Sequence, residues 1–162
     1  MTDFAGQVAV VTGAGSGIGQ GDRAGTRRQG KCYPADVTSD EAVAWLAAAV
    51  IRDFGRLDFL IHSAGVFASG PLETVSIDDL DRQYRTNVRT PYRLTQVLLT
   101  MLKASQGQIV FINSSVGLSS ATVNGGQYAA TKYALRAVAD SLHAEVNALC
   151  VRVLSVYHDV TP

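Results

Sequence analysis

Three side chains of this sequence have the types and the spacing to transfer a proton. Tyr128 and Lys132 are four residues apart in an Ala-rich stretch, and Ser115 follows an apolar run upstream of them. On a helix this spacing places Tyr128 and Lys132 on one face, where the ammonium group can lower the phenol pKa from its ordinary value of about 10. A serine at a strand end could stabilise charge on a substrate oxygen. Because Tyr/Lys pairs are common on exposed helices, other motifs must support this interpretation.

Apolar segments of strand length alternate with segments of helical periodicity along the chain. The predicted strands are residues 7–12, 31–37, 57–61, 108–112 and 151–157. The predicted helices are residues 38–54, a run from 77 through 102 that Pro91 should bend or interrupt, and residues 127–149. This alternation predicts a single α/β domain over residues 1–162, with a doubly wound, mostly parallel, Rossmann-like sheet in three layers. Ligands bind such sheets at the carboxyl ends of the strands.

Three residues are predicted to set helix ends. Thr38 and Glu41 have capping-box spacing at the start of the 38–54 helix, and Gly55 can close its last turn. Ser76 can cap the helix that begins at residue 77.

The first predicted strand runs directly into a glycine-rich turn. Glycines at positions 13, 15, 17 and 19 would let the backbone approach a ligand, and a following helix N-terminus would favour a phosphate. The spacing does not fit G-x-G-x-x-G, because Ile18 stands where the third glycine is required, but it fits T-G-x-x-x-G-x-G. Such a turn alone is weak evidence, since many are only structural.

Composition excludes several classes of function. The formal net charge is zero and no basic run exceeds Arg27-Arg28, so binding to nucleic acid or to a membrane surface has no electrostatic support. No leader or spanning segment is evident, and a cytoplasmic location is expected. Cys32 and Cys150 are expected to be reduced and buried. The histidines show no metal-ligand spacing, and no metal is expected; they are His62, His143 and His158.

In their order along the chain, the motifs resemble those of the short-chain dehydrogenase/reductase family. They are TGAGSGIG (12–19), ADVT (35–38), HSAG (62–65), TNVRT around Asn87, INSSVG around Ser115, and Tyr128-x-x-x-Lys132. Any one of them is unspecific, but together they cover nearly the whole chain. One departure is HSAG, where the family commonly has N-N-A-G, so Ser63 replaces an asparagine that would stabilise the central sheet.

The resemblance implies hydride transfer between NAD or NADP and a small alcohol or carbonyl compound. Tyr128 would be the general acid or base, Lys132 would lower its pKa and hold the nicotinamide ribose, and Ser115 would bind the substrate oxygen. Asn87 would belong to a water relay, although it could equally cap the backbone of a bent helix. Family members are commonly homodimers or homotetramers, and the same is expected here.

The resemblance also implies a set of cofactor contacts. The turn residues would surround the pyrophosphate, namely Gly13, Ser16, Gly17, Ile18 and Gly19. Asp36 and Val37 would contact the adenine, and Ser63, Ala64 and Gly65 the ribose side. The residue that selects NAD or NADP normally ends the second strand of such a fold. That strand is absent from the sequence, so the preference cannot be predicted.

Two junctions do not fit a complete fold of this kind. Residues 20–30 hold three glycines and four charges without an apolar stripe, where a helix and a strand are expected. After Tyr157 the sequence reads HDVTP, where the family continues with a substrate-covering loop. We expect residues to be missing at both junctions, either as omitted mobile segments or as deletions.

Two alternatives remain beside the oxidoreductase interpretation. A non-catalytic relative could keep the sheet and serve as a binding or regulatory subunit, and an epimerase or dehydratase could use the same fold. The residues expected near a substrate are apolar or aromatic, which favours a substrate with an apolar portion; they are Val116, Leu118, Val123 and Tyr157.

Overall fold

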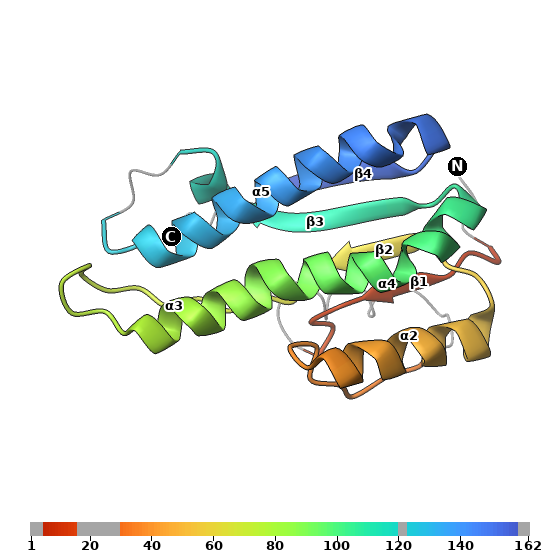
Figure 1. Cartoon of the computed structure of the whole chain (residues 1–162), viewed down its shortest axis with the longest axis horizontal. Coiled ribbons are helices and arrows are strands. Elements are labelled where there is room, and N and C mark those ends of the chain that lie inside the picture. The colour runs from red at the N-terminus through yellow and green to blue at the C-terminus, as the bar shows by residue number, and fades with distance from the viewer. Residues whose placement is uncertain (1–4, 16–29, 120–122, 159–162) are drawn as a thin grey trace.

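Four parallel strands form one sheet in the computed structural model, which describes residues 5–15, 30–119 and 123–158. The strands lie in the order of the sequence: β1 (Ala9–Val11), β2 (Phe59–His62), β3 (Gln108–Ser114) and β4 (Arg152–His158). All three pairings are parallel, and all four strands end at the same edge, on the left in Figure 1. The predicted Rossmann-like α/β fold is confirmed.

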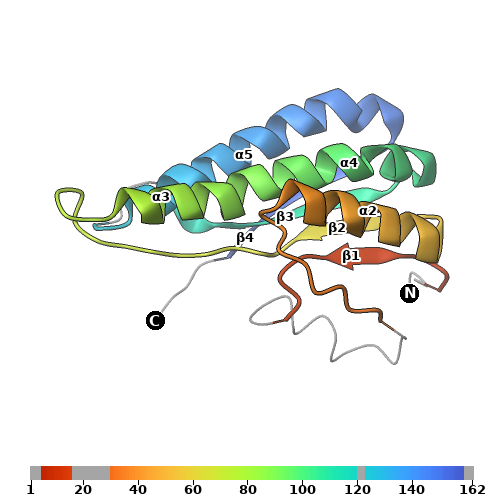
Figure 2. The same ribbon diagram turned by 60° about the horizontal axis from the view of Figure 1, so that its bottom comes forward.

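The described helices cover one face of this sheet, as Figures 1 and 2 show. They are α2 (Asp40–Phe54), α3 (Ile77–Tyr84), α4 (Thr90–Ser105) and α5 (Gly126–Val146), with a π-helical turn η1 (Arg85–Arg89) joining α3 to α4. Two short 3-10 turns, η2 (Ser115–Gly117) and η3 (Asn147–Leu149), follow β3 and α5. Within residues 5–15, 30–119 and 123–158, a second helical layer on the other face is not found.

The core lies between the sheet and these helices. Helical residues at three- and four-residue spacing meet alternate residues of the strands there, as the periodicities of the two structures require. The fully buried side chains include Leu60, Leu94, Leu98, Leu102, Ile109 and Phe111. Burying each such side chain stabilises the fold by about 1.5–3 kcal/mol.

The ends of α2 are close to where the sequence places them. Gly55 has a left-handed φ of 66° and closes the helix as predicted. The N-cap is Ser39 and not Thr38, because the Ser39 hydroxyl accepts the Ala42 N–H. The amide and hydroxyl of Thr38 instead donate to the Asp36 carboxylate. Ser76 caps α3 as predicted, accepting the Asp78 N–H.

The prediction of a strand at residues 31–37 was wrong. Residues 30–36 have no regular secondary structure, and within the described chain β1 pairs only with β2, so no neighbouring strand offers them a ladder. Side chains hold the stretch instead: the Tyr33 hydroxyl donates to Asp53 at 2.6 Å, and Lys31 lies 3.1 Å from the same carboxylate. Cys32 is exposed in consequence, which contradicts its predicted burial.

Cys150 was also expected to be buried and is exposed. It ends η3 with a left-handed φ of 60°, at a surface turn between α5 and β4. Both cysteines are free, as predicted.

Candidate functional site

Tyr128 and Lys132 lie together where α5 begins beside the carboxyl end of β3. The Lys132 Nζ is 5.5 Å from the centre of the Tyr128 ring, so the predicted contact on one helical face is present. Burial raises the pKa of Tyr128 above its ordinary value, and the neighbouring Ser114 side chain acts in the opposite direction. The lowering of this pKa that the sequence predicted from Lys132 is not found, and the phenol is protonated at neutral pH.

Two adjacent serines lie where β3 ends beside Tyr128. Ser114 is the last residue of β3, and its hydroxyl accepts the Val116 N–H. Ser115, the serine predicted from the sequence to bind the substrate oxygen, begins the turn η2 with its side chain half-buried. The role of Ser115 stays a prediction.

Lys132 is a buried cation. Its side chain is 6% exposed, and its Nζ donates to the Ile112 carbonyl at 3.0 Å. Burial lowers its pKa to about 8, because removal from water disfavours the charged form. An ammonium group with one carbonyl partner retains donors for a further ligand.

Asn113 and Gly117 fix the end of β3 against α5. The Asn113 side chain donates to the Lys132 carbonyl at 3.3 Å and accepts the Ser114 N–H at 2.9 Å. A Cβ added to Gly117 would lie 3.0 Å from Asn113 Oδ1 and 3.1 Å from the Lys132 carbonyl oxygen. This close approach sets the distance between the strand that carries Ser114 and the helix that carries Tyr128.

Asn87 lies in the π-helical turn with its side chain 1% exposed. Its Oδ1 accepts the Val66 N–H at 2.8 Å, and its Nδ2 donates to the Val66 carbonyl and to Thr131 Oγ1. The Thr131 hydroxyl in turn donates to the Tyr128 carbonyl at 2.8 Å. The amide thus binds the loop after β2 to the first turns of α5.

A second buried amide network was missed in the sequence. Gln83 Nε2 donates to Gln127 Oε1 at 2.9 Å, and Gln127 Nε2 donates to the Ser76 carbonyl at 3.0 Å. Gln83 Oε1 accepts the Ala68 N–H at 3.2 Å. Gln83 is fully buried and Gln127 immediately precedes Tyr128. A glutamine on an otherwise polar helix gives no sequence signal, and only the packing of α3 against α5 shows that these amides meet.

The start of the glycine-rich turn lies against the loop after β2. The Thr12 hydroxyl accepts the N–H groups of Ser63 and Ala64, both at 3.1 Å. Gly13 has a left-handed φ of 71°, and a Cβ there would lie 2.8 Å from the Ala64 backbone. Glycine is therefore required at position 13. The other predicted pyrophosphate residues, Ser16, Gly17, Ile18 and Gly19, lie outside the described residues.

The predicted adenine residues lie at the start of the segment that leads into α2. Asp36 is exposed, and its hydrogen bonds with Thr38 lower the pKa of the carboxyl group. The Val37 carbonyl accepts a hydrogen bond from Thr90 Oγ1 at 3.0 Å, which ties this segment to the end of η1. Gly65, predicted on the ribose side, is exposed in the loop after β2.

His62 is buried between the sheet and α4. Its Nε2 lies 2.8 Å from Thr95 Oγ1, its ring stacks on Phe111, and burial lowers its pKa to about 3. It is a neutral packing residue in this state. Within the described ranges, no cluster of His, Cys, Asp or Glu has a geometry that could hold a metal ion, and no helix is long and apolar enough to cross a membrane.

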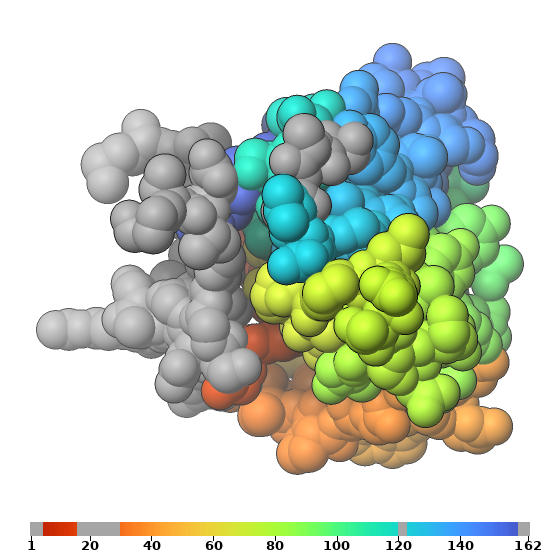
Figure 3. Space-filling model, turned by 90° about the vertical axis from the view of Figure 1, so that its left-hand side faces the viewer, coloured from red at the N-terminus to blue at the C-terminus, as the bar shows by residue number. Residues whose placement is uncertain are grey.

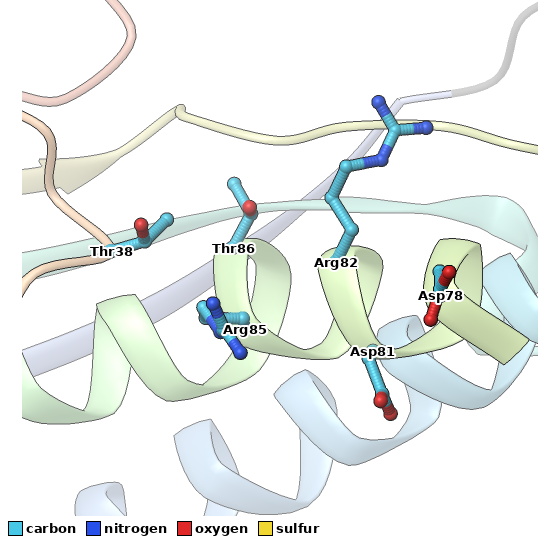
Figure 4. A pocket seen from close by; sticks show the side chains of 6 residues that line it. All are labelled: Thr38, Asp78, Asp81, Arg82, Arg85 and Thr86. Carbon is cyan, nitrogen blue, oxygen red and sulfur yellow. The ribbon is translucent and has the colours of Figure 1, made fainter.

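A surface pocket of about 390 Å³ lies away from these groups, along α3 and η1. Its lining residues are Thr38, Asp78, Asp81, Arg82, Arg85 and Thr86. In Figure 4 the Arg82 and Asp81 side chains point away from one another, on opposite sides of the helix. The mixed charges and the divergent side chains do not converge on a ligand, so the candidate site remains the edge where β3 meets α5.

A family model described as short chain dehydrogenase matches residues 22–161. An uncharacterized oxidoreductase of Staphylococcus aureus strain MW2 is 31% identical over 182 residues, a match that covers 96% of this chain and 78% of that protein. An uncharacterized oxidoreductase of Staphylococcus epidermidis is 30% identical, over 93% of this chain and 76% of its own length.

Two solved structures have similar folds. A short-chain dehydrogenase from Streptomyces avermitilis superposes with a TM-score of 0.86 at 30% identity, covering 93% of this chain and 64% of that chain. The structure of ElxO with NADP bound has a TM-score of 0.75 at 27% identity, covering 79% of this chain and 52% of that chain. The chain thus spans about two thirds or less of these two proteins.

Proposed function

Since this chain belongs to the short-chain dehydrogenase family, we propose that it transfers a hydride between NAD or NADP and an alcohol or carbonyl carbon. The observation that carries the proposal is the contact of the Tyr128 ring with the buried Lys132 ammonium, with a serine hydroxyl close by where β3 ends. These three groups are the types that proton transfer to a carbonyl oxygen requires. The NADP bound to ElxO supports the class of cofactor.

In the reducing direction, Tyr128 donates its proton to the substrate oxygen. Its raised pKa keeps the phenol protonated at neutral pH, so the donor form is ready. We propose that the Ser115 hydroxyl donates a hydrogen bond to the same oxygen and stabilises the charge that develops there. Lys132 stabilises the phenolate that remains on Tyr128 after the transfer. A bound nicotinamide would supply the hydride.

The described residues fit such a cofactor at two places. The Lys132 ammonium has donors beyond its bond to the Ile112 carbonyl, and a ribose hydroxyl could accept one of them. At the other end, the backbone of Gly13 approaches Ala64 so closely that there is no room for a side chain, as a turn that brings the backbone close to a ligand requires. Asp36, Val37 and Gly65 are proposed to contact the adenine and ribose.

A non-catalytic binding or regulatory subunit is the second candidate. The observation in its favour is the stretch 30–36, which has no strand structure beside β1, where nucleotide contacts are expected. Such a protein would keep the sheet and the buried amide networks and bind the cofactor weakly or not at all.

A titration with reduced cofactor separates the two candidates. The enzyme should bind NADH or NADPH, with a change in nicotinamide fluorescence that saturates. If neither NADH nor NADPH binds, the proposal of an enzyme is refuted and the non-catalytic subunit is favoured.

The Tyr128→Phe variant tests the proton transfer itself. It removes the donor and leaves the ring, so reduction of a carbonyl substrate should stop while cofactor affinity stays within about twofold, since the variant keeps Lys132. Turnover at the wild-type rate would contradict the role of Tyr128.

A further inference from the structure

An exposed aromatic ring stands directly beside the Tyr128 phenol. Phe67, in the loop after β2, packs its ring edge-to-face on Tyr128 with the ring centres 5.0 Å apart and the planes at 82°. Phe67 remains 64% exposed, so it contacts Tyr128 without being part of the core. Aromatic side chains beside polar groups commonly line the sites of small molecules.

The backbone on both sides of Phe67 is fixed from the interior. The Asn87 side chain binds the N–H and the carbonyl of Val66, and Gln83 Oε1 accepts the Ala68 N–H. Farther along, the Gly70 N–H donates to the Asn124 carbonyl at 2.9 Å. The loop is thus bound to η1, to α3 and to the segment before α5, so the ring is positioned before any ligand arrives.

The same edge of the molecule presents further apolar side chains. Val123 is 87% exposed in the segment that Asn124 binds to the loop, and Leu118 is 51% exposed at the end of η2. Figure 3 views this edge and shows α3 and its preceding loop against the first turn of α5. A substrate that reaches the Tyr128 hydroxyl from this edge meets the exposed ring of Phe67.

From these contacts we infer that Phe67 determines specificity and selects carbonyl or alcohol substrates that carry an aryl group next to the reacting carbon. The inference rests on the proposed function, because it assigns the substrate of the same site. A flat ring can stack on Phe67 or meet it edge-on while its carbonyl oxygen reaches Tyr128 and Ser115. An aliphatic substituent of equal size lacks the quadrupole that makes aromatic pairs favourable.

A binding experiment tests the inference without depending on turnover. The probe is 4-fluoroacetophenone, and ¹⁹F line broadening by the full chain measures its affinity. We expect Phe67→Ala to weaken binding about three- to tenfold, the range of a lost aromatic contact, and Phe67→Leu to weaken it by a smaller factor. The matched control is Phe54→Ala, which removes a partly exposed phenylalanine at the far end of α2 and should leave the affinity unchanged.

A turnover experiment tests selectivity with two ketones of similar size. The ratio of kcat/KM for acetophenone to that for cyclohexyl methyl ketone should fall about three- to tenfold in Phe67→Ala and stay constant in Phe54→Ala. An unchanged ratio in Phe67→Ala would overturn the inference, as would equal ¹⁹F broadening by wild type and variant.

The two failures can be told apart. If neither NADH nor NADPH supports reduction of any ketone, the proposed function fails, and the broadening alone then decides on Phe67. If ketones are reduced, and neither the ¹⁹F broadening nor the kcat/KM ratio changes in Phe67→Ala, the inference fails while the proposed function stands.

Discussion

The two ends of the candidate site are held together in different ways. At the catalytic end, around Tyr128, buried amides bind backbone groups and one another, with Gln83 and Asn87 at 0% and 1% exposure. At the nucleotide end, residues 30–36 have no strand, and most of their anchors are side chains at the surface, such as the ion pair of Lys31 with Asp53.

The difference teaches where the information for each end lies in the chain. The end of β3 that carries Ser114 and Ser115 is followed in the sequence by α5 with Tyr128 and Lys132, and α3 and η1 pack against α5. The proposed nucleotide end would combine β1, the glycine-rich turn and residues 36–37, which come from separate parts of the chain. The residues around Tyr128 and Lys132 can therefore be held in place independently of those at the proposed nucleotide end.

The largest expected effect concerns the catalytic end and the choice between two serines. Ser115→Ala removes the hydroxyl proposed to bind the substrate oxygen and should lower kcat about 10²–10³-fold, as loss of one donor to a developing oxyanion does elsewhere. Ser114→Ala is the matched comparison and should lower kcat by a smaller factor. Steady-state kinetics with a saturating cofactor measures both, and the opposite ranking would transfer the role to Ser114.

The next effect concerns the buried amides. Asn87→Leu keeps the volume but leaves the Val66 N–H and carbonyl without their side-chain partner, which should lower the free energy of unfolding by about 3 kcal/mol. Urea denaturation followed by circular dichroism measures it. Gln96→Leu, an exposed amide on α4, should change stability by no more than about 0.5 kcal/mol. Equal effects would mean that the interior amides do not stabilise the catalytic end.

A third prediction uses the buried lysine. The Lys132 pKa is about 8 in the folded protein, against 10.5 for a lysine side chain in water, a difference worth about 3 kcal/mol, offset by about 1 for the bond to Ile112. Lys132→Met should therefore stabilise the protein by about 2 kcal/mol at pH 7 while removing activity.

The pH dependence of this gain follows from the same two pKa values. Between pH 8 and 10.5 the unfolded wild-type chain binds more protons than the folded one, so wild-type stability rises with pH across this window. The advantage of Lys132→Met should shrink accordingly, and thermal melts at pH 7 and pH 10 measure it. The exposed Lys103→Met is the control, and a gain that does not depend on pH would contradict the assignment.

The smallest effect is expected at the nucleotide end. Asp53→Asn weakens the bonds to Lys31, Tyr33 and Arg52, so hydrogen exchange should accelerate in residues 31–37 and stay unchanged in α5. Asp140→Asn, which alters an exposed pair on α5, should leave residues 31–37 as they are. Slower or unchanged exchange in Asp53→Asn would show that the backbone, and not these side chains, holds the stretch.

Much of the fold could be predicted because the strands and helices carry strong periodicity. The Tyr128/Lys132 contact followed from helical spacing alone. The prediction of a strand at 31–37 was wrong because a short apolar run forms a strand only when a neighbouring strand pairs with its backbone N–H and C=O groups. Phe67 and the Gln83–Gln127 pair were missed because side chains from different segments meet only in three dimensions.

The π-helical turn between α3 and α4 has a consequence for how the chain can change in length. The Thr90 N–H bonds to the Arg85 carbonyl five residues back, so the turn holds one residue more than an α-helical turn. Deleting that residue would rotate α3 by about 100° relative to α4. Gln83 would then leave the interior. The number of residues in this turn therefore sets the orientation of α3 relative to α4. Insertions and deletions should be far better tolerated in the exposed loop 71–74 than in the turn.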